Sequence, residues 1–323
     1  MTGSGVRAIR YALESPGVET VVAADIDPKA VEETQTNVKL NDLEARISVV
    51  ESDANILFLR HQSKRFDLID LDPFGSPATY FECALRAVLD GGVIAATATD
   101  MGPLTAARPA ACTRKYGVRP VRTEFDKEFA VRVLAACLTE IAGRLELGIS
   151  VVFCHASDHY ARIYATVSKG THFANLATKN LGFVEYCSKC LRRDSRSSLE
   201  MIQTACEDCG TRTEIGGPIW LGSLWDADLV QRMIHSVPTL ESLRLSEVQE
   251  LLARVAEEQS VPAFHYRTHA MAESLGIRPP KLESVLASLR LAGYVGARTH
   301  FHPTGFRTNA TARELSTILK SRT

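Results

Sequence analysis

Short apolar segments alternate with amphipathic ones along the first hundred residues, and this pattern constrains the fold most strongly. Strands are expected at residues 20–24, 47–50, 66–71 and 93–99. Helices are expected at residues 6–14, 28–40 and 77–89. Alternation of this kind is typical of a parallel sheet with helices on both faces. We therefore predict an α/β domain whose ligands bind beyond the carboxyl ends of the strands.

A glycine-rich loop stands before the first expected helix. Gly3, Ser4 and Gly5, together with Ala8, fit the loose pattern G-x-G-x-x-A. Glycines at such a loop let the backbone approach a ligand closely. Asp25 lies 20 residues after Gly5 at a strand end, where a carboxylate can bind ribose hydroxyls. The pattern alone fits a nicotinamide dinucleotide as well as an adenosyl cofactor.

Two further acidic positions belong to the same predicted ligand site. Asp27 is an alternative ribose ligand, although it fits equally well as the N-cap of a helix that begins at Pro28. Asp53, Ala54 and Asn55 follow the next strand, and we expect them to flank an adenine ring. A solvated turn is the alternative interpretation of Asp53.

Only two residues precede the glycine loop, although a doubly wound sheet needs a strand that leads into such a loop. Either that first strand is absent or the chain is truncated. We favour truncation, because an empty slot in the sheet would expose an unpaired ladder of backbone groups.

The sequence Asp-Leu-Asp-Pro-Phe-Gly at residues 70–75 suits chemistry on an exocyclic amine. The Asp72 carboxylate and the Pro73 carbonyl can accept hydrogen bonds from an NH₂ group, and Phe74 can stack on the ring that carries it. Accepting these bonds draws the nitrogen lone pair out of conjugation and aims it at an electrophile. An isolated Asp-Pro is more often a turn, but here it follows a predicted strand. We therefore predict methyl transfer at this site.

Four of the eight cysteines form two CxxC pairs separated by fifteen residues. Cys187, Cys190, Cys206 and Cys209 can close a tetrahedral zinc site. Because four protein ligands leave no open position, the predicted zinc is structural. The scattered cysteines are interpreted as ordinary thiols, at positions 83, 112, 137 and 154.

Composition and length indicate a soluble cytoplasmic protein of about two domains. The chain has 323 residues, is 45% hydrophobic, and has neither a membrane-length apolar stretch nor a visible secretory signal. We place the first domain at residues 1–225, with the zinc module 187–209 inside it and a closing strand near 216–222. Residues 226–323 form the second domain, with helices at 240–258, 268–275 and 280–292 and a strand at 294–299.

Basic residues gather in two places although the net charge is only −1. Residues 105–122 hold five basic residues and no acidic one, and residues 298–323 hold five against one. Beside a base-stacking motif, such clusters favour a nucleic-acid partner. We expect Arg298 and Arg307 to contact phosphates, and His300 and Phe301 to lie near the nucleic acid. A strand face packed on its own domain is the alternative for the histidine.

Several segments resemble the family of tRNA (guanine-N2)-dimethyltransferases that act on guanine 26 of tRNA. They include Gly-Ser-Gly-Val-Arg-Ala-Ile-Arg-Tyr-Ala, Asp-Leu-Asp-Pro-Phe-Gly-Ser-Pro and Cys-Thr-Arg-Lys-Tyr-Gly. The resemblance covers the segments 3–12, 70–77, 97–100, 103–104, 112–117, 158–162, 217–222, 298–305 and 308–310. The chain departs from the family at Thr105, where cysteine is frequent, at Lys127, where histidine is frequent, and in lacking the family's N-terminal segment.

The resemblance implies a Rossmann-like, S-adenosylmethionine-dependent methyltransferase domain and a C-terminal α+β, winged-helix-like domain that helps to hold tRNA. Residues Asp72, Pro73 and Phe74 would hold the target guanine after it leaves its stack. The zinc cysteines occur in part of the family. The implied cofactor residues are Gly3, Ser4, Gly5, Arg7, Asp25, Asp53 and Ala54.

The predicted reaction is the direct transfer of one or two methyl groups to N2 of guanine 26 by a monomeric enzyme. Asp72 either accepts a hydrogen bond or takes the proton. The open alternatives are a nicotinamide oxidoreductase, a methyltransferase on a protein amine or on another nucleic-acid amine, and a truncated tRNA-binding homologue with weak or no activity.

Overall fold

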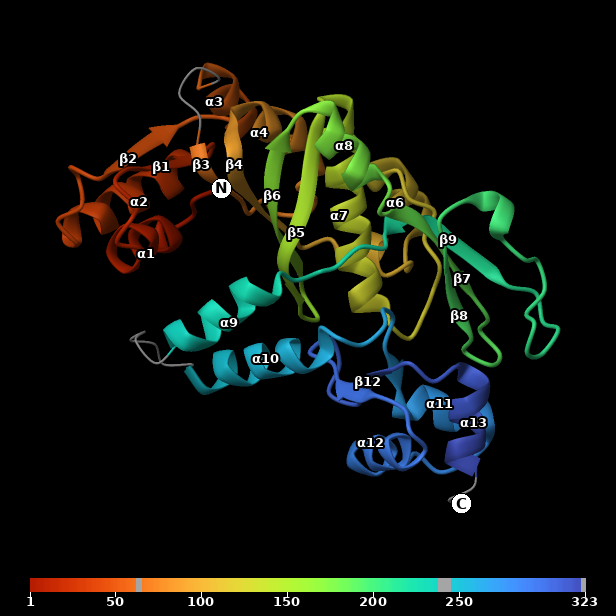
Figure 1. The fold of residues 1–323 in the computed structure, drawn as a ribbon. Coiled ribbons are helices and arrows are strands. Elements are labelled where there is room, and N and C mark those ends of the chain that lie inside the picture. The colour runs from red at the N-terminus through yellow and green to blue at the C-terminus, as the bar shows by residue number, and fades with distance from the viewer. Residues whose placement is uncertain (62–65, 238–244, 321–323) are drawn as a thin grey trace.

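The computed structural model describes residues 1–61, 66–237 and 245–320. Figure 1 shows a central α/β body with an N-terminal unit on one side and an arm on the other. A helical C-terminal lobe lies beneath the body and the arm.

The N-terminal unit consists of α1 (Val6–Glu14), β1 (Val21–Asp25), α2 (Pro28–Leu40) and β2 (Ile47–Glu51). Strands β1 and β2 pair in parallel, as their apolar sequences predicted. Pro28 begins α2 and the Asp27 carboxylate accepts a hydrogen bond from the Lys29 amide at 3.0 Å, so Asp27 is a helix cap. The unit has a small core of its own, made of Ala8, Ile9, Ala12, Ala23, Val38, Leu43 and Ile47.

The main sheet has the order β3-β4-β6-β5. Strand β3 (Phe66–Leu71) is parallel to β4 (Val88–Ala98), as predicted. The parallel sheet was predicted from strands in the first hundred residues only. The other half of the main sheet lay outside that prediction, and there β6 (Ala161–Lys169) is antiparallel to both β4 and β5 (Leu147–Ala156). Only four residues, 157–160, join β5 to β6, and so short a connection can join only antiparallel neighbours.

Strands β1 and β3 belong to different sheets. Within the described ranges, β1 pairs only with β2 and β3 pairs only with β4. At the open edge of β1, the Thr2 amide donates a hydrogen bond to the Ala24 carbonyl at 3.1 Å. Side chains from α1 cross to β3, and these contacts form part of the site described below.

Helices cover the main sheet. The longest, α7 (Asp126–Arg144), is buried along most of its length and packs against β5, β6 and the arm. The predicted helix at 77–89 is shorter than expected, because β4 already begins at Val88. The remaining helices of the body are α3 (Ala54–Arg60), the 3₁₀ helix η1 (Ala78–Tyr80), α4 (Phe81–Ala87), α5 (Met101–Leu104), α6 (Pro109–Tyr116) and α8 (Thr171–Thr178).

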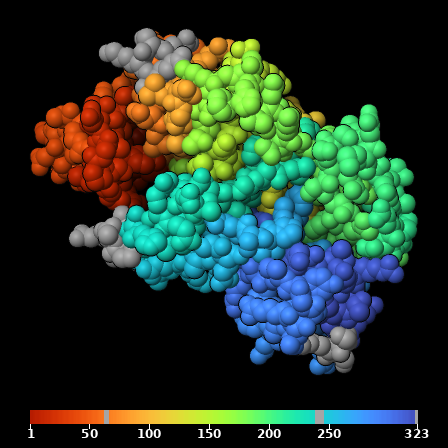
Figure 2. Space-filling view, viewed as in Figure 1, coloured from red at the N-terminus to blue at the C-terminus, as the bar shows by residue number. Residues whose placement is uncertain are grey.

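The arm is a separate antiparallel sheet with the order β8-β7-β9. Its strands are β7 (Leu181–Tyr186), β8 (Arg193–Arg196) and β9 (Glu214–Trp220), and the short helix η2 (Leu199–Met201) follows β8. The segment expected as a closing strand of the first domain is β9, which pairs with β7 instead of joining the main sheet. Figure 2 shows the arm standing out from the body on the side opposite the N-terminal unit.

The C-terminal lobe contains a small antiparallel sheet of order β10-β12-β11 and several helices. The predicted helix at 240–258 is present as α10 (Leu245–Glu258), and its first five expected residues lie outside the described residues. The sequence of two helices followed by a strand is also present, while the winged-helix assignment stays a prediction. The other elements are α9 (Ala227–Ser236), β10 (Tyr266–Arg267), α11 (Thr268–Leu275), α12 (Leu282–Leu291), β11 (Gly296–Arg298), β12 (Gly305–Thr308) and α13 (Ala312–Lys320).

Candidate active site at the strand ends

In the Asp-Pro-Phe turn that follows β3, Pro73 is buried, Asp72 is partly exposed and Phe74 projects into solvent. The Phe74 side chain is fully exposed, at 103% of its reference area, although large aromatic side chains are usually buried. Gly75 turns the chain with φ at 87°, a conformation that favours glycine. Its amide donates to Thr99 Oγ1 at 2.7 Å, and the Thr99 amide donates to the Gly75 carbonyl at 2.9 Å. The end of β4 therefore fixes the turn that presents Phe74.

An arginine–carboxylate cluster lies directly beneath this turn. Asp70 accepts hydrogen bonds from Arg7 at 3.0 Å, from the Tyr11 hydroxyl at 2.8 Å and from Arg162 at 2.9 Å. Arg7 also binds Oδ2 of Asp72. In the part of the chain that the structure describes, Oδ1 of Asp72 has no hydrogen-bond partner, and it is therefore available to a ligand.

The sequence had singled out Arg7 and Asp72 but not Asp70, Tyr11 or Arg162 as functional residues. Arg162 lies in the apolar strand β6 and is only 6% exposed. A charge in such a strand requires a buried partner, and this was the available signal. Burial lowers the pKa of the Arg162 guanidinium, but the charge of Asp70, the nearby Tyr164 and the hydrogen bonds to both together outweigh burial, so the net pKa is raised. Burial and the same carboxylate raise the pKa of Tyr11.

The glycine loop and Asp25 come together as predicted. Gly5 has φ at 79°, and a Cβ atom there would lie 2.7 Å from the side chain of Thr34, so only glycine fits. The Gly3 amide donates to Asp25 Oδ2 at 3.1 Å, and the Asp27 amide donates to Oδ1 at 3.1 Å. Burial raises the pKa of Asp25, but hydrogen bonds from the Met1 ammonium and from these amides lower it to about 2. A carboxylate held in this way remains an acceptor.

Ser4 contributes through its backbone carbonyl, whereas Asp53 contributes through its side-chain carboxylate. The Ser4 carbonyl accepts a hydrogen bond from the Asn37 side chain at 2.8 Å, which ties the loop to α2. Asp53 caps α3 by accepting from the Asn55 amide at 2.9 Å, so the solvated turn is not what forms there. Ala54 is the first residue of that helix. The side-chain oxygen of Asn55 is buried and has no hydrogen-bond partner within the described ranges.

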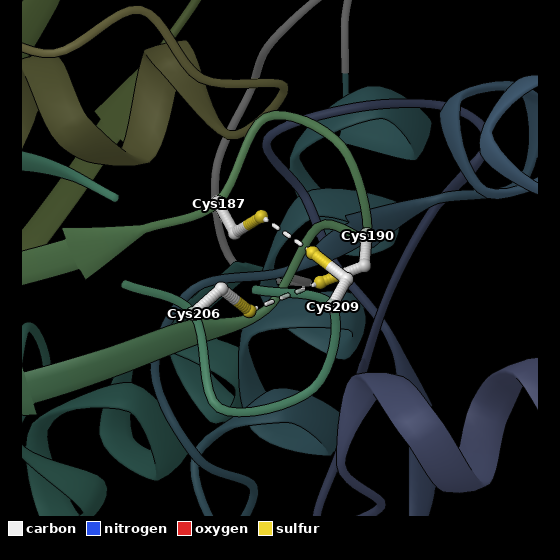
Figure 3. A group of neighbouring side chains, drawn as sticks. All are labelled: Cys187, Cys190, Cys206 and Cys209. Atoms are coloured by element: carbon white, nitrogen blue, oxygen red, sulfur yellow. Dashed lines mark hydrogen bonds between the residues drawn. The ribbon is translucent and has the colours of Figure 1, made fainter. Parts of the chain in front are cut away.

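The four cysteines of the CxxC pairs meet at the base of the arm (Figure 3). Cys187 and Cys190 follow β7, while Cys206 and Cys209 precede β9. The Sγ atoms of Cys187 and Cys209 are 3.5 Å apart, those of Cys190 and Cys206 are 3.4 Å apart, and all four lie within 4.8 Å of one another. These separations exceed a disulfide bond of about 2.05 Å. They approach the roughly 3.8 Å edge of a tetrahedron built with zinc–sulfur bonds of about 2.3 Å.

Charged groups around the cysteines stabilise the arm. Arg192 lies between the two CxxC loops and binds Asp208 at 3.2 Å, Glu207, and Asp194 at 2.8 Å. Hydrogen bonds to Thr211 lower the pKa of the Cys209 thiol to about 6, which favours a thiolate. Arg192 therefore acts mainly within the protein.

The basic stretch 105–122 forms an exposed surface on and around α6. Its basic side chains are exposed, and Lys115 forms an ion pair with Asp100 at 2.9 Å. The four arginines form no ion pair with any other described residue, namely Arg108, Arg114, Arg119 and Arg122. We call these four the α6 arginines.

The prediction that Arg307 contacts phosphates is wrong. Its side chain is 2% exposed and forms ion pairs with Glu128 of α7 at 2.9 Å and with Glu258 of α10 at 2.7 Å. His300 binds Glu258 through Nδ1, and Phe301 is 1% exposed. The alternative interpretation, a face packed on its own domain, is confirmed for His300. Both side chains are buried and unavailable to nucleic acid.

Arg307 belongs to a buried cluster that joins the body to the C-terminal lobe. Glu128 has no exposed surface and also binds Arg132 at 2.9 Å and His265 at 3.1 Å. Burial alone would raise the pKa of Glu128, but Arg307 and Arg132 hold it well below its usual value. For His265, burial lowers the pKa even though the adjacent Glu128 carboxylate acts to raise it. We call Glu128, Arg132, Glu258, His265 and Arg307 the joint cluster.

A glycine loop beside the Asp25 carboxylate, together with an acceptor-bearing turn at another strand end, is an arrangement suited to methyl transfer from a nucleoside-type cofactor to an exocyclic amine. None of the helices in the described part of the chain has the length and apolar character needed to cross a membrane.

Comparison with known proteins identifies the family. The family model described as N2,N2-dimethylguanosine tRNA methyltransferase matches residues 1–320. The chain therefore belongs to this family. It is 34% identical to the tRNA (guanine(26)-N(2))-dimethyltransferase of Methanosphaera stadtmanae, over 98% of this chain and 81% of that protein. It is 36% identical to the protein of the same name from Methanothermobacter thermautotrophicus, over 98% of this chain and 83% of the relative.

A solved structure supports the same grouping. The complex of Trm1 from Pyrococcus horikoshii with S-adenosyl-L-methionine aligns with a TM-score of 0.89 and 33% identity, and the match covers 98% of this chain and 86% of that chain. The α/β class and the recognition of the family are thereby confirmed.

Proposed function

We propose that this protein transfers one or two methyl groups from S-adenosylmethionine to N2 of guanine 26 in tRNA. The observation that carries the proposal is the turn after β3, where Asp72 keeps one carboxylate oxygen free beside a fully exposed Phe74, in a chain of this family. The reaction needs an acceptor and a stacking surface at one place, and this turn offers both. We expect the enzyme to act as a monomer in the cytoplasm.

The residues at the ends of β1 and β2 fit S-adenosylmethionine. Gly3, Ser4 and Gly5 form the loop beside Asp25, with open space where a Gly3 side chain would lie, and Asp25 remains an ionised acceptor for ribose hydroxyls. The unpartnered buried oxygen of Asn55, beside Asp53 and Ala54, is suited to an adenine amino group. When bound, the cofactor supplies an electrophilic methyl group on a sulfonium sulfur.

The protein contributes mainly position and alignment to the transfer. Guanine 26 leaves its stack, and Phe74 offsets part of the lost stacking by covering one face of the ring. Asp72 and the Pro73 carbonyl accept the N2 hydrogens and so direct the nitrogen lone pair away from the ring. After one transfer the nitrogen keeps one hydrogen, so a second round requires the base to be presented again.

The α6 arginines are proposed to contact tRNA phosphates. Their exposure and lack of ion pairs leave their charge available, and a phosphate backbone is the ligand that such a surface favours. Residues 226–323 are proposed as a second tRNA-binding region. Within it Arg298, which is partly exposed, remains a candidate phosphate contact.

The cysteine cluster is proposed to hold one structural zinc ion. Its four sulfur atoms complete a tetrahedral ligand set, which leaves no position for a substrate. Elemental analysis should give about one zinc per chain. Cys190→Ser should lose the metal and loosen the arm, whereas Cys83→Ser, outside the cluster, should keep it. Metal-free protein with an intact arm would contradict the assignment.

The central test is transfer of labelled methyl groups to tRNA that carries guanine or adenine at position 26, with DNA as a further substrate. We expect transfer only to the guanine tRNA. Asp72→Ala should reduce the rate by at least ~100-fold with little change in cofactor binding. Asp67→Ala changes an exposed carboxylate on the same strand and serves as the matched control. Equal rates for both variants would remove Asp72 from the proposed site.

A further inference from the structure

Asp70 has no capacity left for a substrate. Its Oδ1 accepts from Arg7 at 3.0 Å and from Arg162 at 2.9 Å, while Oδ2 accepts from Arg7 at 3.0 Å and from Tyr11 at 2.8 Å. A carboxylate offers about four lone-pair positions, so these bonds occupy all of them. Asp72, two residues later, has one oxygen engaged by Arg7 and the other available. The two carboxylates of one motif therefore perform different tasks.

Arg162 reaches Asp70 across the sheet. Its backbone pairs with Thr97 of β4, and its side chain extends over that strand toward β3. Three acceptors hold the guanidinium: Asp70, the Thr97 hydroxyl and, at 2.8 Å, the Tyr164 hydroxyl. The Tyr164 ring also lies 4.8 Å from its central carbon. Arg162 is thus a rigid, buried group, and it fixes Asp70 from the side opposite the glycine loop.

Arg7 transmits this arrangement to Asp72. Its side chain is 42% exposed and comes from α1, so its position depends on the partners that hold it. One nitrogen binds both oxygens of Asp70, and the other binds Oδ2 of Asp72. Fixing Oδ2 in this way also fixes the direction in which Oδ1 points.

We propose that Asp70 and Arg162 are positioning residues, which hold Arg7 so that Asp72 presents Oδ1 to the N2 amine of guanine. This inference rests on the proposed function and deepens it. A simpler role would be to attach α1 to the main sheet. That role predicts lost stability and weaker cofactor binding, whereas positioning predicts a slower transfer step that depends on Asp72.

A double-mutant cycle separates the two roles. Single-turnover methyl transfer to tRNA is measured for wild type, Asp70→Asn, Asp72→Asn and the double variant. We expect Asp70→Asn to lower the rate roughly 10- to 100-fold, because a displacement of about 1 Å is enough for such a loss. In the Asp72→Asn background the same change should lower the rate less than about 3-fold, since its effect acts through Asp72.

The product distribution gives a second readout that a structural role would not change. In the second transfer, the one remaining N2 hydrogen must be hydrogen-bonded to Asp72 Oδ1. Because Asp70 helps to hold Asp72 in position, Asp70→Asn should raise the proportion of monomethylated product. Arg162→Lys keeps a charge near Asp70 but loses the forked contacts, and it should show a smaller defect of the same kind. Arg10→Gln breaks an exposed ion pair with Glu14 on α1, the helix that also carries Arg7, and serves as the control.

Transfer by the wild-type protein tests the reaction itself, and the cycle then decides the role of Asp70. Thermal unfolding and calorimetry with S-adenosylhomocysteine accompany each variant. The positioning role would be overturned if the free-energy costs of the two single changes added independently in the double variant. It would also be overturned if the loss of rate in Asp70→Asn were matched by an equal loss of cofactor affinity. Should Asp70→Asn fail to fold, Arg162→Lys in the two Asp72 backgrounds provides the same cycle.

Discussion

The two basic stretches look alike in the sequence but differ in the folded protein. Residues 105–122 place the α6 arginines on an exposed surface without ion pairs to the described residues. Residues 298–323 include Arg307, which is buried between Glu128 and Glu258. The comparison teaches that local charge indicates a polyanion partner only where the fold leaves that charge unpaired.

The physical reason lies in the elements that carry the arginines. Helix α6 begins at Pro109, ends before Gly117 and carries Arg114 on its exposed face. The other three α6 arginines lie in the segments on either side of this helix, where their side chains also reach water. Strand β12 has no exposed residue, and a charge placed there must be compensated because an isolated buried ion is very costly. Glu128 and Glu258 supply that compensation from α7 and α10.

The largest expected effect comes from breaking the joint cluster. Arg307→Met leaves two buried carboxylates with less compensation, and it should lower the free energy of unfolding by about 3–5 kcal/mol. Chemical denaturation measures this change. Arg313→Met, an exposed arginine of the same lobe, is the control. A loss below about 1 kcal/mol would mean that Arg307 contributes little to joining the lobe to the body.

The second effect concerns tRNA affinity. Replacing Arg114 and Arg119 by alanine should weaken tRNA binding and flatten the dependence of log affinity on log salt by about one unit per lost phosphate contact. Stability and S-adenosylmethionine binding should not change, because both side chains are exposed. Fluorescence titration at several salt concentrations measures the slope. An unchanged slope would move tRNA recognition away from α6.

A smaller effect should appear on acidification. The folded-state pKa of His265 is lowered, so the unfolded chain takes up its proton first, and stability that is present above about pH 6.5 is lost as pH falls. One such group contributes at most about 1.4 kcal/mol per pH unit. The pKa values of Glu128 and Glu258 are also lowered, so their contribution is present above about pH 4.5 and is lost below it.

Denaturation of wild type and His265→Gln between pH 8 and pH 5 tests this expectation. The variant lacks the titrating imidazole, and its stability should therefore depend less on pH over this window. Parallel curves for the two proteins would show that His265 does not couple stability to pH.

The smallest effect on stability is expected at Arg298. Its ion pair with Glu283 joins side chains that are 38% and 64% exposed, and such surface pairs contribute about 0–1 kcal/mol. Arg298→Ala should leave the unfolding free energy nearly unchanged. If Arg298 contacts a phosphate, the salt slope should fall by about one unit. A large loss of stability would make Arg298 resemble Arg307 and would weaken the distinction between exposed and buried basic residues.

Local sequence patterns were sufficient to predict many elements and part of the site. Helices α1 and α2 and strand β3 lie where residue spacing and capping predicted them. Each CxxC pair is likewise a local unit, whereas the meeting of the two pairs joins Cys187 to Cys209, 22 positions away. The local features depend on interactions over a few residues, and such interactions are recorded in the order of the side chains.

The sequence by itself thus determined the α/β class, the glycine loop, the place of the Asp-Pro-Phe motif at a strand end and the family to which the chain belongs. Only the tertiary structure decided that β6 runs antiparallel to both β4 and β5, that Arg307 is buried, and that Arg162 binds Asp70. The last contact joins residues 92 positions apart, and Arg307 meets Glu128 from the opposite half of the chain. Whether a charged side chain contacts water, a ligand or a buried partner depends on which distant element packs against it, and no local spacing specifies that choice.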